Sequence, residues 1–378
     1  MSSTRRHYNW WTISALNTVS AFLPSTPLPK AAQGLFSASE YVEMCAFFAA
    51  HPQLTATPTK PLDDLATTLG LGSLLVKDET ARFGLNAFTL LGARFALETL
   101  IADGAIARGD LLVCASEGNH GRAVARAARE SGCRARVYMA HDAAQARVDA
   151  IAGEGAEVIR VDGSYDDAVR LLQDDARETG ATIVSDTSWP GYERIPRLIM
   201  LGYTRMADEI AASGITPDVV FVQGGVGGLL CGVGSWFATH APTTRIVCVE
   251  PTSAACLQAS AQAGSPIAVT GELSTAMAGL RNREVSPLAF EAVRSIVSAF
   301  VAIDDVWSVE AMRALKSVGI AAGASGAAAL GGLLAVCRDE SMRDVRRSLE
   351  LDAKAHVVAI VSEGVTDPSH WESVTGRS

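Results

Sequence analysis

The chain has 378 residues and a formal net charge of −9 at pH 7, with 48% hydrophobic and 19% charged residues. This length predicts two domains, and the composition supplies a large core and excludes a disordered chain. The negative charge argues against nucleic acid or an anionic membrane as the main partner.

The seven cysteines are scattered along the chain, and none belongs to a C-x-x-C pair. This pattern favours free thiols in a cytoplasmic protein over a disulfide framework or a metal site. Arg5-Arg6 resembles the start of a twin-arginine export signal, but polar residues interrupt the segment that follows, so we expect no export. The longest apolar run, residues 326–337, is too short for a membrane span.

The first 110 residues contain few regular elements. An amphipathic pattern predicts a helix over residues 37–48, and residues 55–62 predict an extended, proline-fixed segment before a short helix at 63–69. A strand that begins at Leu75 then leads through a charged turn and Gly84 into a further helix.

Beyond residue 110, short apolar strands alternate with helices, which is typical of parallel sheets covered on both faces. No repeat or linker separates two domains, so we expect them to be interleaved. The expected strands are residues 111–115, 136–139, 157–161, 182–185, 219–222, 245–250 and 357–361. The expected helices are residues 121–130, 143–151, 165–178, 197–212, 287–300 (with Ser286 as its N-cap), 309–321 and 326–339.

Two turns after predicted strands have the composition of ligand-binding sites. Residues 219–229 form a strand, a glycine-rich turn and a helix start, in which backbone N–H groups and the helix N-terminus can hold an anion. Asp186 follows another predicted strand, at the edge where open α/β sheets bind ligands. Asp186 could instead cap its own turn, and glycines also serve tight turns alone.

Residues 77–89, KDETARFGLNAFT, resemble the motif K-D-E-S-x-R-F-G-L-N-A-F-K of diaminopropionate ammonia-lyases, which are pyridoxal-phosphate enzymes of the tryptophan synthase β (fold type II) architecture. Five further motifs and the glycine-rich turn follow in the family's order between about residues 50 and 375. They are CASEGNHG at 114–121 (family T-D-G-N-H-G), DTSWPGYERIP at 186–196 (D-T-A-W-E-G-Y-x-K-I-P), TAMAGL at 275–280 (T-I-M-A-G-L), GASG at 323–326 (G-E-S-G) and SEGVTD at 362–367 (T-E-G-D-T-D).

The resemblance implies an α/β protein of two interleaved three-layer domains with parallel sheets, a large domain of residues 1–88 plus 200–378 and a small domain of residues 89–199. It also implies a homodimer, pyridoxal phosphate as cofactor and a small amino-acid-like substrate. The implied catalytic positions are Thr89, Glu117 and Asp186. The implied cofactor-binding residues are Phe88, Asn119, Gly224, Gly225, Val226, Gly227, Gly228 and Ser362. The implied substrate-binding residues are Ser116, His120, Tyr192, Met277 and Ala278.

The chain departs from the family where its chemistry is centred. The last lysine of the family motif forms the Schiff base with the cofactor, and Thr89 stands in its place. A threonine hydroxyl cannot form an imine. Glu117 replaces an aspartate, which carries the acid one methylene further, and Ala324 replaces a glutamate. Lys77 also occurs in the family motif beside the true lysine, so we expect a structural role for it.

Three interpretations follow. The first is a divergent lyase that acts by α,β-elimination or related chemistry on an aldimine formed directly between substrate and cofactor, with Glu117 or Asp186 removing the α-proton. The second is a non-catalytic or cofactor-free descendant that binds a small ligand or a partner in the inherited cleft. The third is an active-site lysine mutant of an ordinary ammonia-lyase. The additional changes at 117 and 324 argue against the third, and the retained glycine-rich turn favours the first.

Overall fold

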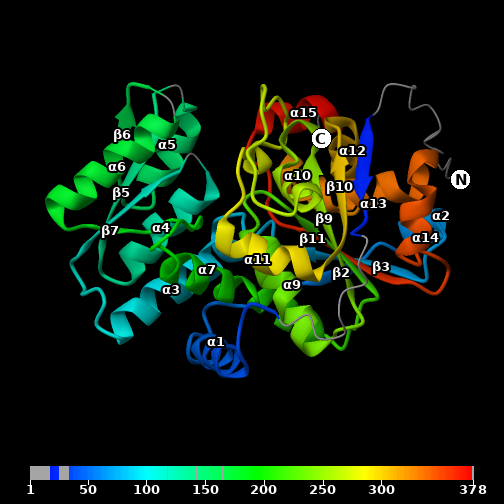
Figure 1. Ribbon diagram of the computed structural model, residues 1–378, viewed down its shortest axis with the longest axis horizontal. Helices are drawn as coiled ribbons and strands as arrows, with labels where there is room; N and C mark the ends of the chain where they lie inside the picture. The colour runs from blue at the N-terminus through cyan, green and yellow to red at the C-terminus, as the bar shows by residue number, and fades with distance from the viewer. Residues whose placement is uncertain (1–17, 25–33, 117, 142, 164, 377–378) are drawn as a thin grey trace, which may run out of the picture.

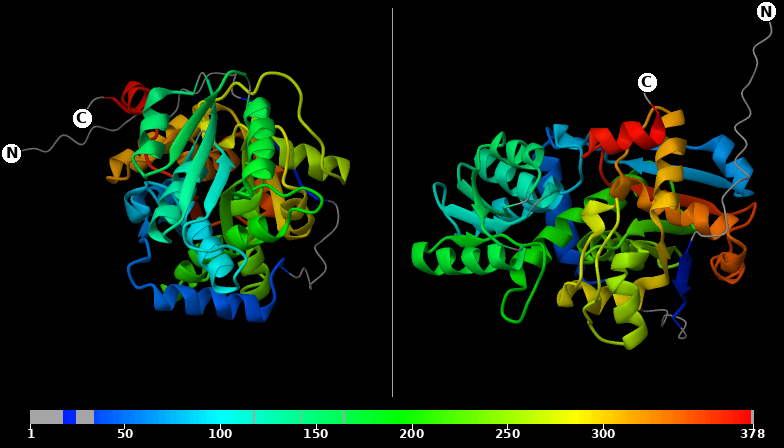
Figure 2. Two further views of the ribbon diagram at one scale, coloured as in Figure 1. Left: turned by 90° about the vertical axis from the view of Figure 1, so that its left-hand side faces the viewer. Right: turned by 90° about the horizontal axis from the view of Figure 1, so that it is seen from above.

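The computed structural model describes residues 18–24, 34–116, 118–141, 143–163 and 165–376. Arg5-Arg6 and Glu117 lie outside these residues. The described chain forms two lobes, each built on its own sheet (Figure 1). The view from above in Figure 2 shows the smaller lobe beside the larger one.

The larger lobe contains a seven-stranded sheet with the order β1-β10-β9-β8-β11-β3-β2. The five central strands run parallel, and the two edge strands are antiparallel to their neighbours. The strands are β1 (Val19–Phe22), β2 (Thr59–Pro61), β3 (Ser73–Asp78), β8 (Val219–Gln223), β9 (Arg245–Pro251), β10 (Val297–Ile303) and β11 (His356–Val361).

The smaller lobe contains a four-stranded, fully parallel sheet with the order β6-β5-β4-β7. Its strands are β4 (Leu111–Ala115), β5 (Arg134–Ala140), β6 (Glu157–Val161) and β7 (Thr182–Ile183). The strands of the two sheets fall within the two predicted segments, and we propose residues 1–88 plus 200–378 and residues 89–199 as the domains. The parallel α/β architecture predicted from the sequence is confirmed.

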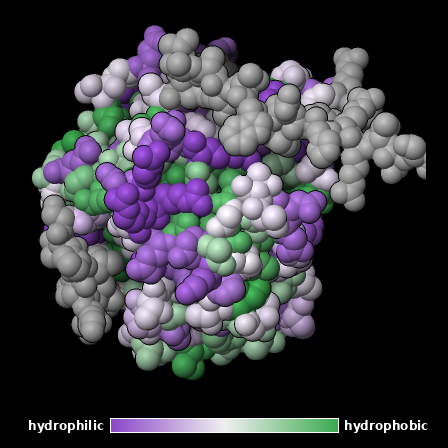
Figure 3. Space-filling view, turned by 90° about the vertical axis from the view of Figure 1, so that its right-hand side faces the viewer, coloured by the Kyte–Doolittle hydropathy of each residue, from purple (hydrophilic) through white to green (hydrophobic). Residues whose placement is uncertain are grey.

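Helices cover both sheets. Figure 3 views the molecule from the side that carries α2 and α14, where hydrophilic residues gather in the middle of the face. One face of the large sheet packs against α2 (Asp63–Leu69), α12 (Asp305–Ser317), α13 (Ala324–Arg338), α14 (Arg343–Ser348) and α15 (Pro368–Thr375). The core on its other face includes α1 (Ala38–Ala50), α7 (Arg194–Tyr203), α8 (Arg205–Ala212), α9 (Gly228–His240), α10 (Cys256–Ala263) and α11 (Pro287–Ile296). The small sheet is flanked by α3 (Leu90–Ala102), α4 (Asn119–Glu130), α5 (Gln145–Ala152) and α6 (Tyr165–Thr179). The short 3₁₀ turns are η1 (Arg82–Gly84), η2 (Thr252–Ala254), η3 (Ala278–Leu280) and η4 (Glu340–Met342).

One hydrophobic core joins the two lobes. It contains side chains from β4 and β5 of the small sheet as well as from β8, β9 and β11 of the large sheet. Between them, α3, α7 and α9 cross at glycines. A Cβ added to Gly92 would lie 2.6 Å from the Ile199 carbonyl oxygen, and one added to Gly202 would lie 2.6 Å from that of Leu91. A Cβ on Gly232 would lie 2.7 Å from the Met200 carbonyl oxygen. These helices therefore touch backbone to backbone.

The predicted helix over residues 287–300 is wrong in its last part. The helix ends at Ile296, and residues 297–303 form strand β10, which pairs with β9 and β1 inside the large sheet. The sequence of this strand, VSAFVAI, is a continuous apolar run. Such a run fits a buried strand and a buried helix equally well. When an element is covered on all sides, its sequence lacks the alternation of apolar and polar residues that would distinguish a strand from a helix. Strand β1 and helices α10, α14 and α15 were also not predicted.

Two further predictions need correction. The helix predicted over residues 197–212 is divided at Thr204, whose hydroxyl donates to the Leu201 carbonyl oxygen at 2.6 Å. Ser286 does occupy the N-cap position of α11, but its side chain makes no capping hydrogen bond. The Ser286 hydroxyl instead lies 2.9 Å from that of Ser188, and the Ser188 hydroxyl accepts from the Leu288 amide at 2.9 Å. The cap thus comes from a distant loop.

The seven cysteines all lie among the described residues and are free thiols. Within the described part of the chain, no helix combines the length and the apolar character that a membrane crossing requires.

Candidate active site

Most of the predicted site residues come from loops that follow parallel strands. These are the loops after β3, β4, β7, β8 and β11, and the ends of these strands meet where the two lobes face each other. Met277 and Ala278 instead lie in the segment between α10 and α11. Because the carboxyl ends of parallel strands share one edge of a sheet, side chains far apart in the sequence meet there.

Thr89 directly precedes α3, at its N-cap position, and is 7% exposed. Its hydroxyl donates to the Asn119 carbonyl oxygen at 3.0 Å, which joins the loop after β3 to the start of α4. The neighbouring Phe88 is half-buried, and the centre of its ring lies 4.8 Å from that of Tyr203 in an edge-to-face arrangement. The residue in place of the family's lysine therefore lies among the other predicted site residues and presents a hydroxyl group.

The loop before Thr89 is fixed by a buried cluster of charges. The Lys77 amine donates to a Glu209 carboxylate oxygen at 2.5 Å and to the Thr57 carbonyl oxygen at 2.6 Å. The Arg82 guanidinium binds both Glu79 and Glu209. Burial lowers the pKa of Lys77, although the two glutamates oppose that shift. The structural role expected for Lys77 fits this geometry, because its amine is already engaged.

The Lys316 amine is also engaged. Its amine donates to the Thr375 and Gly376 carbonyl oxygens, at 3.3 and 2.6 Å, and lies 4.7 Å from the centre of the Trp371 ring. These carbonyls end α15, where a cation is favourable.

The glycine-rich turn after β8 has the geometry of an anion-binding loop. Gly225 and Gly227 have φ of +61° and +100°, which favour glycine. A Cβ on Gly224 would lie 2.6 Å from Cγ of Glu250, and one on Gly227 would lie 3.0 Å from Cβ of Ala289. Among the described residues, no acceptor takes the amide N–H groups of residues 225, 226 and 228. These amides and the N-terminus of α9 are free to bind a phosphate.

Two buried carboxylates lie near this turn. Glu250 accepts hydrogen bonds from the Leu257 and Gln258 amides, both at 2.8 Å, and burial raises its pKa to about 7. Glu363 follows Ser362 after β11 and accepts a hydrogen bond from the side chain of Asn119. Burial raises the pKa of Glu363 as well. Asn119, predicted to contact the cofactor ring, is thus held against an acid that the sequence prediction did not select.

His120 and Asp186 form a second polar pair. His120 Nε2 lies 2.9 Å from the Val184 carbonyl oxygen and so carries the proton of that hydrogen bond. Its Nδ1 is buried, has no hydrogen-bond partner among the described residues and lies 3.9 Å from the Asp186 carboxylate. The Asp186 side chain is 33% exposed. The imidazole and the carboxylate are therefore neighbours without a direct hydrogen bond between them.

Several other predicted site residues make hydrogen bonds within the fold or are buried in it. The Ser116 hydroxyl accepts from the Gly121 amide at 2.9 Å. The Tyr192 hydroxyl donates to the Ile183 carbonyl oxygen and accepts from the Ser185 amide, each at 2.8 Å. Met277 is fully buried, and its neighbours Ala276 and Ala278 line a cavity. Ser362 is 4% exposed, and its carbonyl oxygen accepts from the Phe88 amide at 3.3 Å. Val226 is half-buried, and its carbonyl accepts from the Ser286 amide.

A cleft of about 170 Å³ opens beside Glu363. Its walls come from α5 of the small lobe and from η3, α12, α13 and α15 of the large lobe. Arg147 and Arg281 line it, although no motif pointed to either residue. A lone arginine in a segment without a motif gives no signal in a single sequence, because most arginines lie on solvated surfaces.

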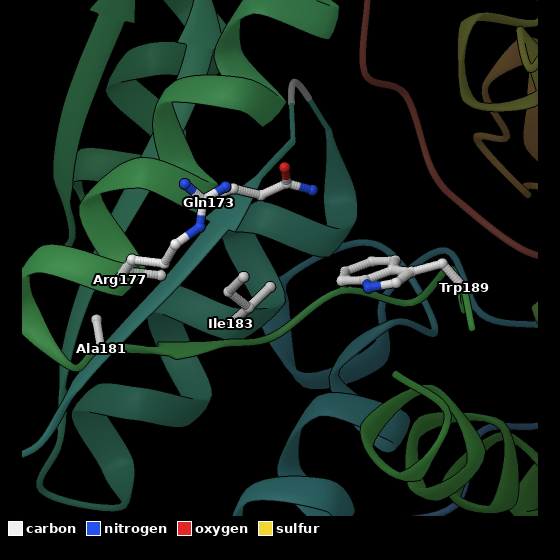
Figure 4. Close-up of a pocket in the computed structure, with 6 residues that line it drawn as sticks. Gln173, Arg177, Ala181, Ile183 and Trp189 are labelled. Carbon is white, nitrogen blue, oxygen red and sulfur yellow. The ribbon is translucent and has the colours of Figure 1, made fainter. Parts of the chain in front are cut away.

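A larger open pocket of about 400 Å³ lies beside α6 and β7, with Arg177, Ala181 and Ile183 toward one end and Trp189 at the other (Figure 4). The Trp189 ring stacks on Tyr192 at 4.0 Å between centroids. None of the predicted site residues lines this pocket.

Comparison with known proteins agrees with the geometry. Residues 51–363 match the family described as pyridoxal-phosphate dependent enzyme. The chain is 38% identical over 344 residues to diaminopropionate ammonia-lyase of Escherichia coli. The aligned region covers 84% of this chain and 86% of the relative. The relative of Salmonella typhimurium is 35% identical over 384 residues, with 92% and 95% covered. The crystal structure of the holo Escherichia coli enzyme superposes with a TM-score of 0.87 at 34% identity, over 95% of this chain and 97% of that one.

Proposed function

Because this chain belongs to the pyridoxal-phosphate-dependent enzymes, and within them to the diaminopropionate ammonia-lyase family, we propose that it is a divergent lyase that holds its cofactor without a covalent bond. Its substrate would be a small amino acid, and its reaction α,β-elimination or related chemistry. The observation that carries this proposal is the buried hydroxyl of Thr89, which hydrogen-bonds to Asn119 at the position where the resemblance places the family's lysine.

The residues present fit the cofactor. We propose that the free amides of Gly225, Val226 and Gly228 hold its phosphate, since the glycines leave a cradle that side chains would fill. Asn119 would face its ring, and Ser362 would lie at its pyridine nitrogen. When bound, pyridoxal phosphate supplies an aldehyde for the substrate amine and a ring that stabilises charge left at the α-carbon.

The remaining chemistry falls to the chain's own side chains. Asp186 would take the α-proton, and this role is supported by its partial exposure and by its position 3.9 Å from His120 Nδ1. The free Nδ1 of His120 would share that proton with Asp186. Thr89 would replace the amine of the family's lysine only as a hydrogen-bonding group. Glu117 is a second candidate for this base. We also propose that the protein forms a homodimer and is located in the cytoplasm.

Replacing Gly227 by alanine is expected to weaken the affinity for pyridoxal phosphate by about tenfold or more, since φ of +100° and the contact with Ala289 would displace the amides. Gly264→Ala is a matched control. Gly264 also has positive φ (+73°), but a Cβ there would meet nothing within 4 Å. Cofactor titration by fluorescence separates the two variants, and equal losses in both would contradict the cradle.

The proposed function is tested by the absorption spectrum of the purified protein. With pyridoxal phosphate alone, we expect the spectrum of the non-covalent cofactor. Added 2,3-diaminopropionate or serine should produce a new visible band that depends on the protein, together with slow release of ammonia. A cofactor that passes through a desalting column unbound would contradict the proposal and would favour the cofactor-free descendant.

A further inference from the structure

The cleft beside Glu363 contains more unused hydrogen-bond donors than acceptors. Arg147 reaches it from α5, and Arg281 from the segment after η3. Among the described residues, neither guanidinium lies within 4.0 Å of a carboxylate, and Arg281 makes one long contact of 3.4 Å to the Thr275 carbonyl oxygen. Figure 1 shows α5 in the lobe on the left and α15 at the top of the lobe on the right. The cleft thus receives positive charge from both lobes.

Two nitrogen atoms of α15 strengthen this pattern. His370 and Trp371 both line the cleft. His370 Nε2 and Trp371 Nε1 are buried and have no hydrogen-bond partner in the described part of the chain. An indole N–H can only donate, so the Trp371 nitrogen requires an acceptor that the described protein does not supply. Buried polar groups without partners are costly and are usually satisfied by water or a ligand.

The two acidic groups of the cleft accept hydrogen bonds from groups other than the arginines. Glu363 accepts from the Asn119 side chain, and Asp367 accepts from the His370 amide at 3.0 Å as the N-cap of α15. Burial favours the neutral form of Glu363. The two carboxylates therefore do not neutralise the arginines through direct contacts, and a ligand anion would meet free donors.

Ala324 also affects the balance of charge in the cleft. Its side chain lines the cleft at the start of α13 and is 7% exposed. The diaminopropionate ammonia-lyase motif resembled by residues 323–326 has a glutamate at this position, and that acid would add a negative charge beside the two arginines. Its absence leaves the cleft less suited to a cationic side chain and better suited to an anionic one.

We propose that this cleft binds the second acidic group of an amino acid substrate, a phosphate, sulfonate or carboxylate carried at or beyond its β-carbon. Arg147 and Arg281 bind that anion, and the Trp371 indole N–H donates to it. The inference rests on the proposed function, because it concerns the substrate of the same site. It distinguishes this chain from its ammonia-lyase relatives, because the side chain of 2,3-diaminopropionate ends in an amine.

The test compares three amino acids that differ at the β-carbon, O-phosphoserine, serine and 2,3-diaminopropionate, each in both enantiomers. Their Kd values are measured by calorimetry with the full chain saturated with pyridoxal phosphate. We expect one enantiomer of O-phosphoserine to bind at least about tenfold more tightly than the same enantiomer of serine, since charge-assisted hydrogen bonds to arginine are strong. Arg147→Ala and Arg281→Ala should each remove most of this preference.

Two further variants make the result specific. Ala324→Glu should weaken O-phosphoserine binding by about tenfold or more and should improve binding of 2,3-diaminopropionate. Arg283→Ala is the matched control, because Arg283 is exposed two residues beyond Arg281 and does not line the cleft. Its guanidinium donates to the Val269 carbonyl oxygen at 3.4 Å. This variant should leave the Kd values of all three amino acids unchanged.

Cofactor binding is measured in the same preparations by absorbance after desalting. If pyridoxal phosphate and serine bind but O-phosphoserine binds no better than serine, the anion subsite is wrong and the proposed function stands. If pyridoxal phosphate does not bind to the unchanged protein, the proposed function fails first. A preference for O-phosphoserine that survives both arginine substitutions would also overturn the assignment.

Discussion

Thr89→Lys is expected to let pyridoxal phosphate become covalently attached to residue 89, whereas the unchanged chain is expected to release it on denaturation. Residue 89 adjoins Asn119 through the 3.0 Å hydrogen bond, and it follows a loop held by buried charges, so a new side chain starts from a fixed point. An amine there would restore a covalent and acid–base catalyst. Release of pyruvate and ammonia from 2,3-diaminopropionate should then rise by about 10³-fold or more.

The attachment is measured by borohydride reduction followed by mass spectrometry of the peptide that contains residue 89. Thr89→Met is the control, because methionine has a long unbranched side chain without an amine. Attachment in the lysine variant without any ammonia release would mean that the chemistry has moved away from the family's reaction. No attachment in the lysine variant would mean that residue 89 does not face the cofactor.

Glu209→Ala is expected to lower the free energy of unfolding by about 3–5 kcal/mol, since it leaves Lys77 and Arg82 buried with Glu79 as their remaining carboxylate. The side chains of Lys77 and Arg82 are fully buried, and that of Glu209 is 2% exposed. Arg82 and Lys77 hold the pKa of Glu209 below its usual value despite burial, so the carboxylate is charged at neutral pH.

The measurement is urea unfolding at pH 7, followed by tryptophan fluorescence. Asp208→Ala is the matched control, since Asp208 precedes Glu209 in α8 and its side chain is 25% exposed in an ion pair with Arg205. We expect the control to lose no more than about 1 kcal/mol. Similar losses in the two variants would show that the buried cluster contributes little to the stability of the fold.

Much of the fold could be predicted because its signals are local. The strand before Gly224 is apolar, and the glycines after it announce the turn. Strand β10 could not be predicted, because a strand buried on both faces has no period that distinguishes it from a helix. Its place between β9 and β1 is set by tertiary pairing.

Candidate site residues could be selected from the sequence where they lie in loops directly after strands. Thr89, Asn119 and Asp186 stand in recognisable motifs, and the structure brings the loops of all three to the interface of the lobes. Arg147 and Arg281 were missed because their significance lies in having no carboxylate partner among the described residues, which only the folded arrangement shows. The contact between Asn119 and Glu363 likewise joins residues 244 positions apart.

The core shared by the two sheets limits which changes of sequence the fold can tolerate. Leu112 and Val137 of the small sheet belong to the same apolar cluster as Val220 and Ile246 of the large one. Neither lobe could be replaced by an unrelated domain or expressed separately without exposing a large apolar surface to water. With such a core, substitutions of single side chains at the site can alter ligand binding while the fold is kept, whereas an exchange of whole segments cannot.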